Sequence, residues 1–435
     1  STVSTSSPVL VSGPAGVSWS FVAGVLSSFA ITTTGLLYSW GQNNNTTSGG
    51  ALGQGGVGTG NISSPVLVSG PAGASWSLVS VNSSNPDYVM GITTTYKLYG
   101  WGNNVNGNAI PYNPLGAAVS SPVQVGSSSW SAVSMSENTP LVVNAITSDG
   151  KLFAWGSASN PIRLGTYSAT GGTVAQSGIP ILVSGPAATS WSAVSTGAGG
   201  GHTLAITSTG QLYAWGLGTI GQLGNLGTVS ILSPVLVSGP ASTSWASISA
   251  GYSHSLATST TGQLYAWGAG TLGQIGNLGI TNASSPVLVS GPASTSWSFV
   301  AAGADVALAV TNASLAYGWG NNLTNGLPYS TYLSTPVQIG TSSWTSVSAG
   351  GSFSVGILAN GSLYAWGLNG GYQLGNATAT NTFSPTLVTN YAYKNTYTYI
   401  DQSGSGGNGG YIDTQGRLWA SGNGSAPGNL TTTAA

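Results

Sequence analysis

A Trp-Gly dipeptide at the end of a short apolar segment recurs along this chain and constrains its fold more than any other feature. Seven intact copies are followed by one altered copy, Leu418–Gly422. Neighbouring copies lie about fifty residues apart, and a period of that length indicates one supersecondary unit repeated along the chain. The tryptophans of the eight copies are Trp40, Trp101, Trp155, Trp215, Trp267, Trp319, Trp366 and Trp419.

The clearest repeat runs from Ser233 to Gly268 and contains four segments with strand-forming sequence. Each segment is short, alternating or wholly apolar, and bounded by Gly, Pro or Ser, as expected for antiparallel strands joined in a meander. Because no stretch combines a helical period with capping residues, we expect essentially no helix. The pattern predicts an all-β fold, a single β-propeller of four-stranded antiparallel blades. The four segments are Ser233–Val237, Ser244–Ala250, His254–Ser259 and Gln263–Trp267.

A second tryptophan stands near the start of the second segment of most repeats. Burying an indole removes a large apolar area from water, so truncation to Ala costs several kcal/mol. We therefore expect both tryptophans of each repeat to pack between neighbouring blades. The second set is Trp19, Trp76, Trp130, Trp191, Trp245, Trp297 and Trp344, with Tyr397 or Tyr399 in the eighth repeat.

Two repeats, Gly199–Asn225 and Gly251–Asn277, carry a longer motif: GGGHTLAITSTGQLYAWGLGTIGQLGN and GYSHSLATSTTGQLYAWGAGTLGQIGN. The order of the His-x-Leu-Ala, Thr-x-x-Gly, Trp-Gly and Gly-Gln-Leu-Gly elements resembles the regulator of chromosome condensation repeat family. The similarity extends over essentially the whole chain. It implies a β-propeller, usually of seven blades. The best-known activity of the family is guanine nucleotide exchange on a small GTPase, with chromatin binding. Since this chain has eight copies, we predict eight blades, with seven as the alternative.

The two ends of the chain predict how the propeller closes. In the family's blade order a Ser-Pro-Val-Leu-Val strand comes last, yet this chain begins with one, Ser7–Val11. The eighth repeat supplies only three strands, about Tyr397–Gln402, Gly410–Thr414 and Gly416–Ala420. We predict that residues 1–11 complete the last blade and remove its exposed edge, with residues 424–435 as the closing loop. Donation of this strand to a neighbouring molecule is the alternative. One domain then spans residues 1–435, with repeats ending near residues 41, 102, 156, 216, 268, 320, 367 and 422.

Charged residues are almost absent from the chain. Only 3% of its 435 residues are Asp, Glu, Lys or Arg and the net charge is −1, whereas a typical soluble domain is about 25% charged. Without a basic field, we expect no nucleic-acid partner. A nearly neutral surface gives little repulsion and favours association with copies of itself or with other subunits. The chain has no cysteine and no apolar run long enough for a transmembrane helix, so we expect no disulfide, thiolate metal site or membrane insertion.

The two histidines, His202 and His254, occupy matching places in adjacent repeats. Histidine serves in metal binding and acid–base catalysis. Other repeats, however, hold Ser27, Val306 and Phe353 at this place, and no cysteine or carboxylate stands beside either histidine at ligand spacing. We interpret both histidines as structural.

Asp401, Asp413 and Arg417 cluster in the last repeat. A carboxylate pair supports general acid–base catalysis, but we favour a surface or interblade salt bridge near the closure point. The charged residues of repeats two and three form no catalytic pattern. These are Asp87, Lys97, Glu137, Asp149, Lys151 and Arg163. We therefore predict no catalytic, cofactor-binding or metal-binding residue, and no enzyme activity.

Long connections in the first three repeats exceed those of repeats four and five. They are Gln42–Ser63, Asn103–Ser121 and Gly156–Gly178. Loops on one propeller face normally carry binding. Uncharged tyrosines in such segments suit protein or carbohydrate surfaces, with packing onto their own blade as the alternative. The candidate surface-binding residues are Tyr112, Tyr167, Tyr329 and Tyr332.

These patterns predict a non-catalytic structural or surface-binding propeller that acts through protein–protein contacts. We expect it in a larger extracellular, cell-surface or virion assembly. A glycan-binding adhesion module that uses the loop tyrosines is one alternative. A guanine nucleotide exchange factor is another, disfavoured because exchange in the family relies on charged loops.

Overall fold

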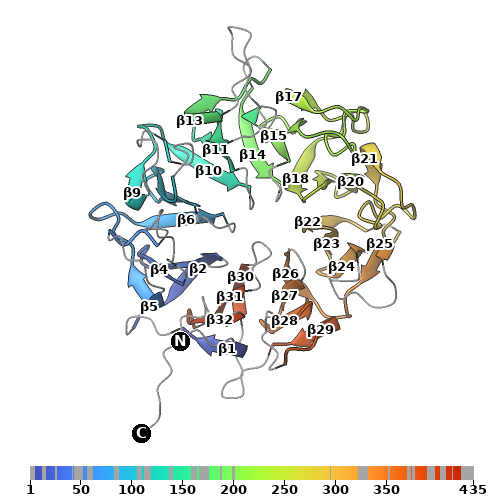
Figure 1. Ribbon diagram of the computed structural model, residues 1–435. Coiled ribbons are helices and arrows are strands. Elements are labelled where there is room, and N and C mark those ends of the chain that lie inside the picture. Colours follow the sequence, from blue (N-terminus) through green and yellow to red (C-terminus); the bar gives the residue numbers. More distant parts are fainter. Residues whose placement is uncertain are drawn as a thin grey trace. The chain divides into compact units, whose positions relative to one another are not determined.

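The computed structural model describes most of the chain. The described residues are 5–11, 16–24, 27–41, 43, 52–55, 62–82, 88–104, 110–111, 119–136, 141–157, 164–165, 176–186, 189–197, 201–293, 295–321, 332–350, 353–369, 374, 378–388, 397–401, 408–413 and 415–422. They form short strands, β1 to β32, and contain no α-helix (Figure 1).

The strands form eight four-stranded antiparallel sheets, one for each Trp-Gly copy. We number the sheets in chain order. The first is β2 (Trp19–Gly24), β3 (Ser27–Thr32), β4 (Leu37–Gly41) and β5 (Ile62–Leu67). The second is β6 (Trp76–Val81), β7 (Tyr88–Thr93), β8 (Leu98–Gly102) and β9 (Val119–Gln124). The third is β10 (Trp130–Met135), β11 (Val142–Thr147), β12 (Leu152–Ser157) and β13 (Gln176–Leu182). The fourth is β14 (Trp191–Thr196), β15 (His202–Thr207), β16 (Leu212–Gly216) and β17 (Ile231–Leu236).

The remaining sheets follow the same order of strands until the last. The fifth is β18 (Trp245–Ala250), β19 (His254–Ser259), β20 (Leu264–Gly268) and β21 (Ala283–Leu288). The sixth is β22 (Trp297–Ala302), β23 (Val306–Thr311), β24 (Ala316–Asn321) and β25 (Tyr332–Gln338). The seventh is β26 (Trp344–Ala349), β27 (Phe353–Leu358), β28 (Leu363–Gly367) and β29 (Thr382–Leu387). The eighth is β30 (Tyr397–Asp401), β31 (Asn408–Asp413) and β32 (Leu418–Gly422), joined by β1 (Thr5–Leu10).

The first strand of the chain completes the eighth sheet, as predicted. The strand order there is β1-β32-β31-β30, and β1 pairs antiparallel with β32, with Val9 opposite Ala420 and Leu10 opposite Trp419. The Val11 N–H extends this pairing by donating to the Leu418 carbonyl at 2.9 Å. The residues predicted as the closing loop, 424–435, lie outside the described part of the chain.

The strands group into two compact units. Unit 1 comprises Ser1–Ser127 and Ser352–Ala435, and unit 2 comprises Ser128–Gly351. Within unit 2, β14, β18 and β22 contact one another in succession, and within unit 1, β2 contacts β6 and β31. The extent of a single domain, residues 1–435, stays a prediction.

A bulge recurs at the start of the sheets, directly after the first tryptophan. In the fourth sheet, Trp191 lies opposite Thr207 but Ala193 lies opposite Ile206, so one residue is extra. Ser192 Oγ lies 3.2 Å from the Ile206 carbonyl and 3.1 Å from the Thr207 carbonyl, which suits the local break in the ladder. The eighth sheet shows the same shift after Tyr397, which lies opposite Asp413. Tyr397 therefore takes the tryptophan position in that sheet.

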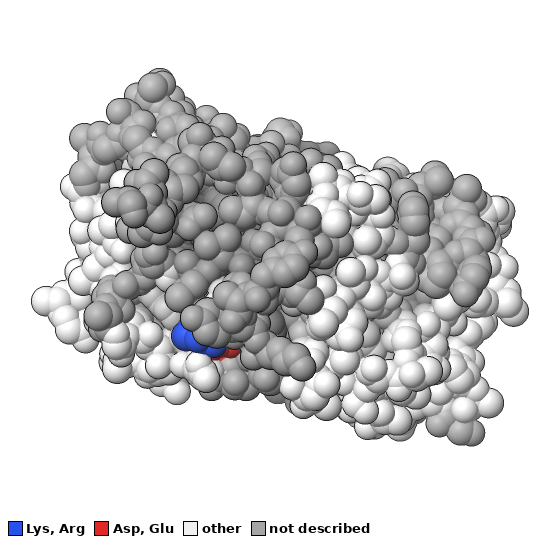
Figure 2. All heavy atoms as spheres, turned by 90° about the horizontal axis from the view of Figure 1, so that it is seen from below, with Lys and Arg blue, Asp and Glu red and all other residues white. Residues whose placement is uncertain are grey.

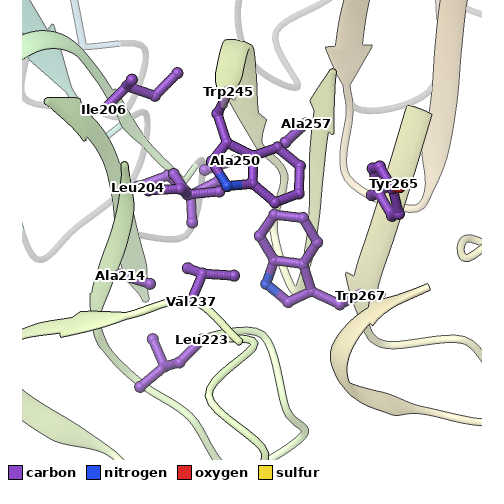
Figure 3. Close-up of a cluster of buried hydrophobic side chains, with 11 residues drawn as sticks. Leu204, Ile206, Ala214, Leu223, Val237, Trp245, Ala250, Ala257, Tyr265 and Trp267 are labelled. Carbon is purple, nitrogen blue, oxygen red and sulfur yellow. The ribbon is translucent and has the colours of Figure 1, made fainter. Parts of the chain in front are cut away.

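The tryptophans make up much of the core. All fifteen are buried, each with at most 6% of its surface exposed. The cluster between the fourth and fifth sheets combines Leu204, Leu223 and Val237 of one sheet with Trp245 and Trp267 of the next (Figure 3). The two indoles meet at a centroid distance of 6.3 Å. This arrangement places both tryptophans of a repeat between neighbouring sheets of unit 2.

Each sheet has two distinct ends, and the distinction locates the candidate site. Connections from first to second strand and from third to fourth strand lie at one end, which we call the loop end. The Ala269 N–H donates to the Ser253 carbonyl at 2.9 Å, joining these two connections in the fifth sheet. Second-to-third turns lie at the opposite end, which we call the hairpin end. There the Thr260 N–H donates to the Ser244 carbonyl at 2.8 Å.

Candidate functional site

Large apolar side chains are exposed at the loop end of the fourth and fifth sheets. Leu226 and Val229, in the connection 217–230, are each 71% exposed. Leu278 and Ile280, in the connection 269–282, are 75% and 46% exposed. Leu226 and Leu278 occupy the same place in two adjacent repeats. The two connections therefore present matched apolar tips to solvent.

Both tips are held in a backbone conformation that disfavours leucine. The φ angle is +69° at Leu226 and +73° at Leu278. This left-handed conformation destabilises a residue that has a Cβ by roughly 1–2 kcal/mol, whereas glycine adopts it readily. Neither the exposure of the two leucines nor their left-handed backbone conformation stabilises the fold.

A buried glutamine anchors each connection to the next sheet. The Gln222 carbonyl accepts from the indole N–H of Trp267 at 2.9 Å, and the Gln274 carbonyl accepts from that of Trp319 at 2.8 Å. The side-chain oxygen of Gln222 accepts from the Ile220 N–H at 3.1 Å. The connections are thus fixed by hydrogen bonds, and their tips are preorganised.

Glycines let the two connections approach the indoles closely. A Cβ on Gly224 would lie 2.7 Å from the indole nitrogen of Trp267, and one on Gly276 would lie 2.8 Å from that of Trp319. Both glycines also have positive φ angles, +66° and +70°. Only glycine satisfies both demands.

Backbone hydrogen bonds tie each of the two tips to the fourth strand of the next sheet. The Leu226 N–H donates to the Ser284 carbonyl at 2.7 Å, at the point where the connection 269–282 ends in β21. The Leu278 N–H donates to the Ser334 carbonyl at 2.8 Å, two residues beyond Tyr332 in β25. Tyr332 is 38% exposed. We call Leu226, Val229, Leu278, Ile280 and Tyr332 the loop-end surface.

The charged residues of the described chain gather mainly at the hairpin end. Lys97, Lys151 and Arg417 follow second-to-third turns of their sheets. Asp149 and Lys151 form an exposed pair at 2.6 Å, and Lys151 holds the pKa of that carboxyl below its usual range. Figure 2 shows how sparse charge is among the described atoms of one face. Asp305 is a charged residue at the loop end, in the first-to-second connection of the sixth sheet.

A cavity of about 350 Å³ lies at the hairpin end of unit 2, beside the Asp149–Lys151 pair. It is lined by Lys151, Leu152, Leu182, Val183, Ser184, Gly185, Pro186, Thr189 and Trp191. Its walls are mostly apolar, and the Lys151 ammonium is paired with Asp149.

The histidines are core residues. His202 and His254 are 1% and 0% exposed, and burial lowers the pKa of His202 to about 3 and that of His254 to about 4. His202 Nε2 lies 2.9 Å from Ser255 Oγ, which donates to the Gln222 carbonyl at 2.9 Å. The described residues contain no group of three or more His, Cys, Asp or Glu that could hold a metal ion.

Asp413 closes a turn of the eighth sheet and pairs within its own sheet. It is 2% exposed, and its carboxylate accepts from Arg417 Nε at 2.8 Å and from the indole N–H of Trp419 at 2.9 Å. It also accepts from the Arg417 backbone N–H at 2.8 Å. In the fourth sheet Thr207 Oγ1 accepts the equivalent N–H, from Gln211, at 3.0 Å. Asp413 and Arg417 thus form the predicted salt bridge, but within one sheet rather than between blades, and Asp413 also caps the turn.

Several residues singled out from the sequence lie outside the described residues. They are Asp87, Tyr112, Glu137, Arg163, Tyr167 and Tyr329. Asp401 lies in β30, the edge strand on the side of the eighth sheet opposite β1. Of the four candidate tyrosines, Tyr332 is the one that the structure describes. The two tips share the sequence Asn-Leu-Gly, at Asn225–Gly227 and Asn277–Gly279. This repeated tripeptide is the signal in the sequence that could have identified the tips.

The family model of the regulator of chromosome condensation (RCC1) repeat matches this chain. Two versions of the model match, one at residues 209–258, 261–310 and 360–396 and the other at 193–222, 245–274 and 344–373. The chain therefore contains RCC1 repeats, which support an RCC1-repeat β-propeller. The matched segments include the connections 217–230 and 269–282, so Leu226 and Leu278 lie within RCC1 repeats.

Curated relatives resemble this chain over part of their length. The E3 ubiquitin-protein ligase HERC2 of Homo sapiens is 33% identical over 178 residues, which cover 41% of this chain and 4% of HERC2. The ultraviolet-B receptor UVR8 of Arabidopsis thaliana is 28% identical over 242 residues, covering 55% of this chain and 52% of UVR8. The chain thus spans about half the length of UVR8 and a small part of HERC2.

A solved RCC1-type propeller shares the fold. The crystal structure of Prp20p from Saccharomyces cerevisiae matches with a TM-score of 0.64 at 20% identity, covering 90% of this chain and 92% of Prp20p. No helix in the described part of the chain has the length and apolarity to span a membrane.

Proposed function

We propose that this RCC1-repeat propeller is a non-catalytic protein-binding module and that it contacts its partner through the loop-end surface. The carrying observation is the pair of exposed leucines, Leu226 and Leu278, at matched positions of adjacent repeats and at positive φ. Burial of exposed apolar side chains at an interface removes them from water, and a fixed backbone lowers the entropy lost on binding.

The comparisons support a protein as the partner. Prp20p binds Gsp1p and histones, so the partners named for this structural relative are proteins. Charged side chains cannot dominate the recognition of a partner by this chain, because only 3% of its residues are charged. Apolar contacts and hydrogen bonds then carry the binding, so its affinity should depend little on salt.

The other candidate functions make different demands. A glycan-binding module would depend on Tyr332, and a glycan array should then show hits that the Tyr332→Ala variant loses. An exchange factor would accelerate nucleotide release from a small GTPase. Under our proposal the array shows no hits and the release trace stays flat. Membership of an extracellular, cell-surface or virion assembly stays a sequence-based prediction.

Affinity purification from the native source tests the proposal. The bait is the full chain, compared with the Leu226→Gly/Leu278→Gly variant and with Tyr96→Gly. Tyr96 is a matched control because it is 57% exposed with a φ of +62° but lies at a hairpin turn. We expect a defined protein that the full chain and Tyr96→Gly retain between about 0.05 and 0.5 M salt, and that the double variant loses. Equal retention by all three baits, or loss of the protein in high salt, would contradict the proposal.

A further inference from the structure

We infer that the partner at the loop-end surface is a second copy of this chain, the two copies being related by a two-fold axis. This inference rests on the proposed function and names its partner. Leu226 of one copy then packs against Leu278 of the other, and the reverse contact forms at the same time.

The repetition of the tips makes the surface complementary to itself. A two-fold interface needs a patch in which residue i meets residue j while j meets i. The connections 217–230 and 269–282 supply this because they carry the same Asn-Leu-Gly tip in the same conformation, on adjoining sheets of one unit. A half-turn exchanges the two tips, so both leucines of each copy gain an apolar partner together.

The charges of the chain do not oppose such pairing. The net charge is −1, and the five residues of the loop-end surface are all uncharged. Two copies that meet at this surface therefore repel each other little. Burial of the five side chains also removes no ionised group of the loop-end surface from water.

The sheet edges are poorly suited to the other common route of self-association, strand pairing. The fourth strand of each of the first seven sheets ends its sheet and contains a proline. Proline lacks an N–H and blocks continued pairing along an edge. These prolines are Pro65, Pro122, Pro180, Pro234, Pro286, Pro336 and Pro385. Side-chain packing at the loop end remains open to such a contact.

Sedimentation equilibrium of the purified full chain tests the inference. We expect a monomer–dimer equilibrium at concentrations up to about 200 µM, the range in which a micromolar dimer is well populated. The Leu226→Gly/Leu278→Gly variant should raise the dimer Kd at least about tenfold, a loss of about 1.4 kcal/mol, while Tyr96→Gly leaves it unchanged. A full chain that stays monomeric throughout, or a double variant that dimerises as well as the full chain, overturns the inference.

A charge rescue tests the register of the pairing. Leu226→Asp alone should weaken the dimer, because the carboxylate meets Leu278 of the other copy. Adding Leu278→Lys should restore dimerisation, since each new carboxylate then faces a new ammonium. A combined variant no stronger than Leu226→Asp overturns the two-fold register.

The two proposals fail separately. If the full chain is monomeric but its loop-end surface still captures a different protein, the second-copy inference falls and the proposed function stands. If it neither dimerises nor captures a protein through this surface, both fall.

Discussion

A single hydroxyl group separates two otherwise matched polar sites in adjacent repeats. His202 reaches Ser255 Oγ, which bridges to the Gln222 carbonyl. In the next repeat Ala307 stands at the position of Ser255, and neither ring nitrogen of His254 has a side-chain hydrogen-bond partner among the described residues. The first site is bridged, and the second lacks the hydroxyl that would bridge it.

Ala307→Ser should therefore stabilise the protein. The new hydroxyl can accept from His254 Nε2 and donate to the Gln274 carbonyl, as Ser255 does one repeat earlier. One such buried hydrogen bond contributes about 1 kcal/mol to the free energy of unfolding, measurable by urea denaturation. Ser255→Ala is the reciprocal control and should lower it by about 1–3 kcal/mol. A destabilised Ala307→Ser variant would show that the site has no room for the hydroxyl.

The same histidines predict a pH dependence of stability. Their pKa values, about 3 and about 4 when folded, lie below the ordinary value of 6.5, so the unfolded chain binds their protons first. Stability is then full above about pH 6.5 and falls as the pH drops toward the folded pKa values. Both sites therefore lower the free energy of unfolding steadily between about pH 6.5 and pH 4.

A double variant isolates this effect. His202→Val/His254→Val uses the residue that the sixth repeat has at this position, Val306. Because the chain has only six acidic residues, the variant's unfolding free energy should be much flatter between about pH 7 and pH 4. A profile as steep as that of the unmodified chain would assign the pH dependence to other groups.

At the scale of elements, the strands followed from the sequence and the loop-end surface did not. The segments predicted as Ser244–Ala250 and His254–Ser259 match β18 and β19 closely, because each has a tryptophan or histidine at a fixed place and a clear apolar pattern. The conformation of Leu226 depends instead on a hydrogen bond to Ser284, a residue of the next sheet. Sequence periodicity carries no information about such a contact. The sequence predicted the pairing of Asp413 with Arg417, but not the hydrogen bonds by which Asp413 caps the turn, since these appear only once the turn has formed.

The tips should be dispensable for folding. Leu226→Gly and Leu278→Gly remove little buried area and relieve the positive φ angles. The free energy of unfolding should therefore stay the same or rise by up to about 1 kcal/mol for each variant. Thermal or urea unfolding measures it. A loss of more than about 1 kcal/mol would mean that the leucines pack within the fold rather than serve a partner.

At the scale of the whole molecule, the eighth sheet depends on one strand from the opposite end of the chain. Without β1, the eighth sheet would keep three strands and expose the edge of β32. The extra strand at the start of the chain and the three-stranded eighth repeat predicted this pairing. The blade order of the repeat family supplied the missing strand.

Deleting residues 1–11 should lower the thermal unfolding temperature and promote aggregation through the exposed edge. A synthetic peptide of residues 1–11 should restore the unfolding temperature in a concentration-dependent way, and a scrambled peptide should not. If the truncated chain is as stable as the full one, β1 does not hold the eighth sheet together.

The most direct test of the central claim is photo-crosslinking from the loop-end surface. A photoreactive amino acid is placed at position 226 or 278 of the full chain, and at position 96 as the hairpin-end control. We predict protein adducts from positions 226 and 278, either with a second copy or with another protein, and none from position 96. Adducts from position 96 alone would contradict the claim that this propeller binds through its uncharged loop end.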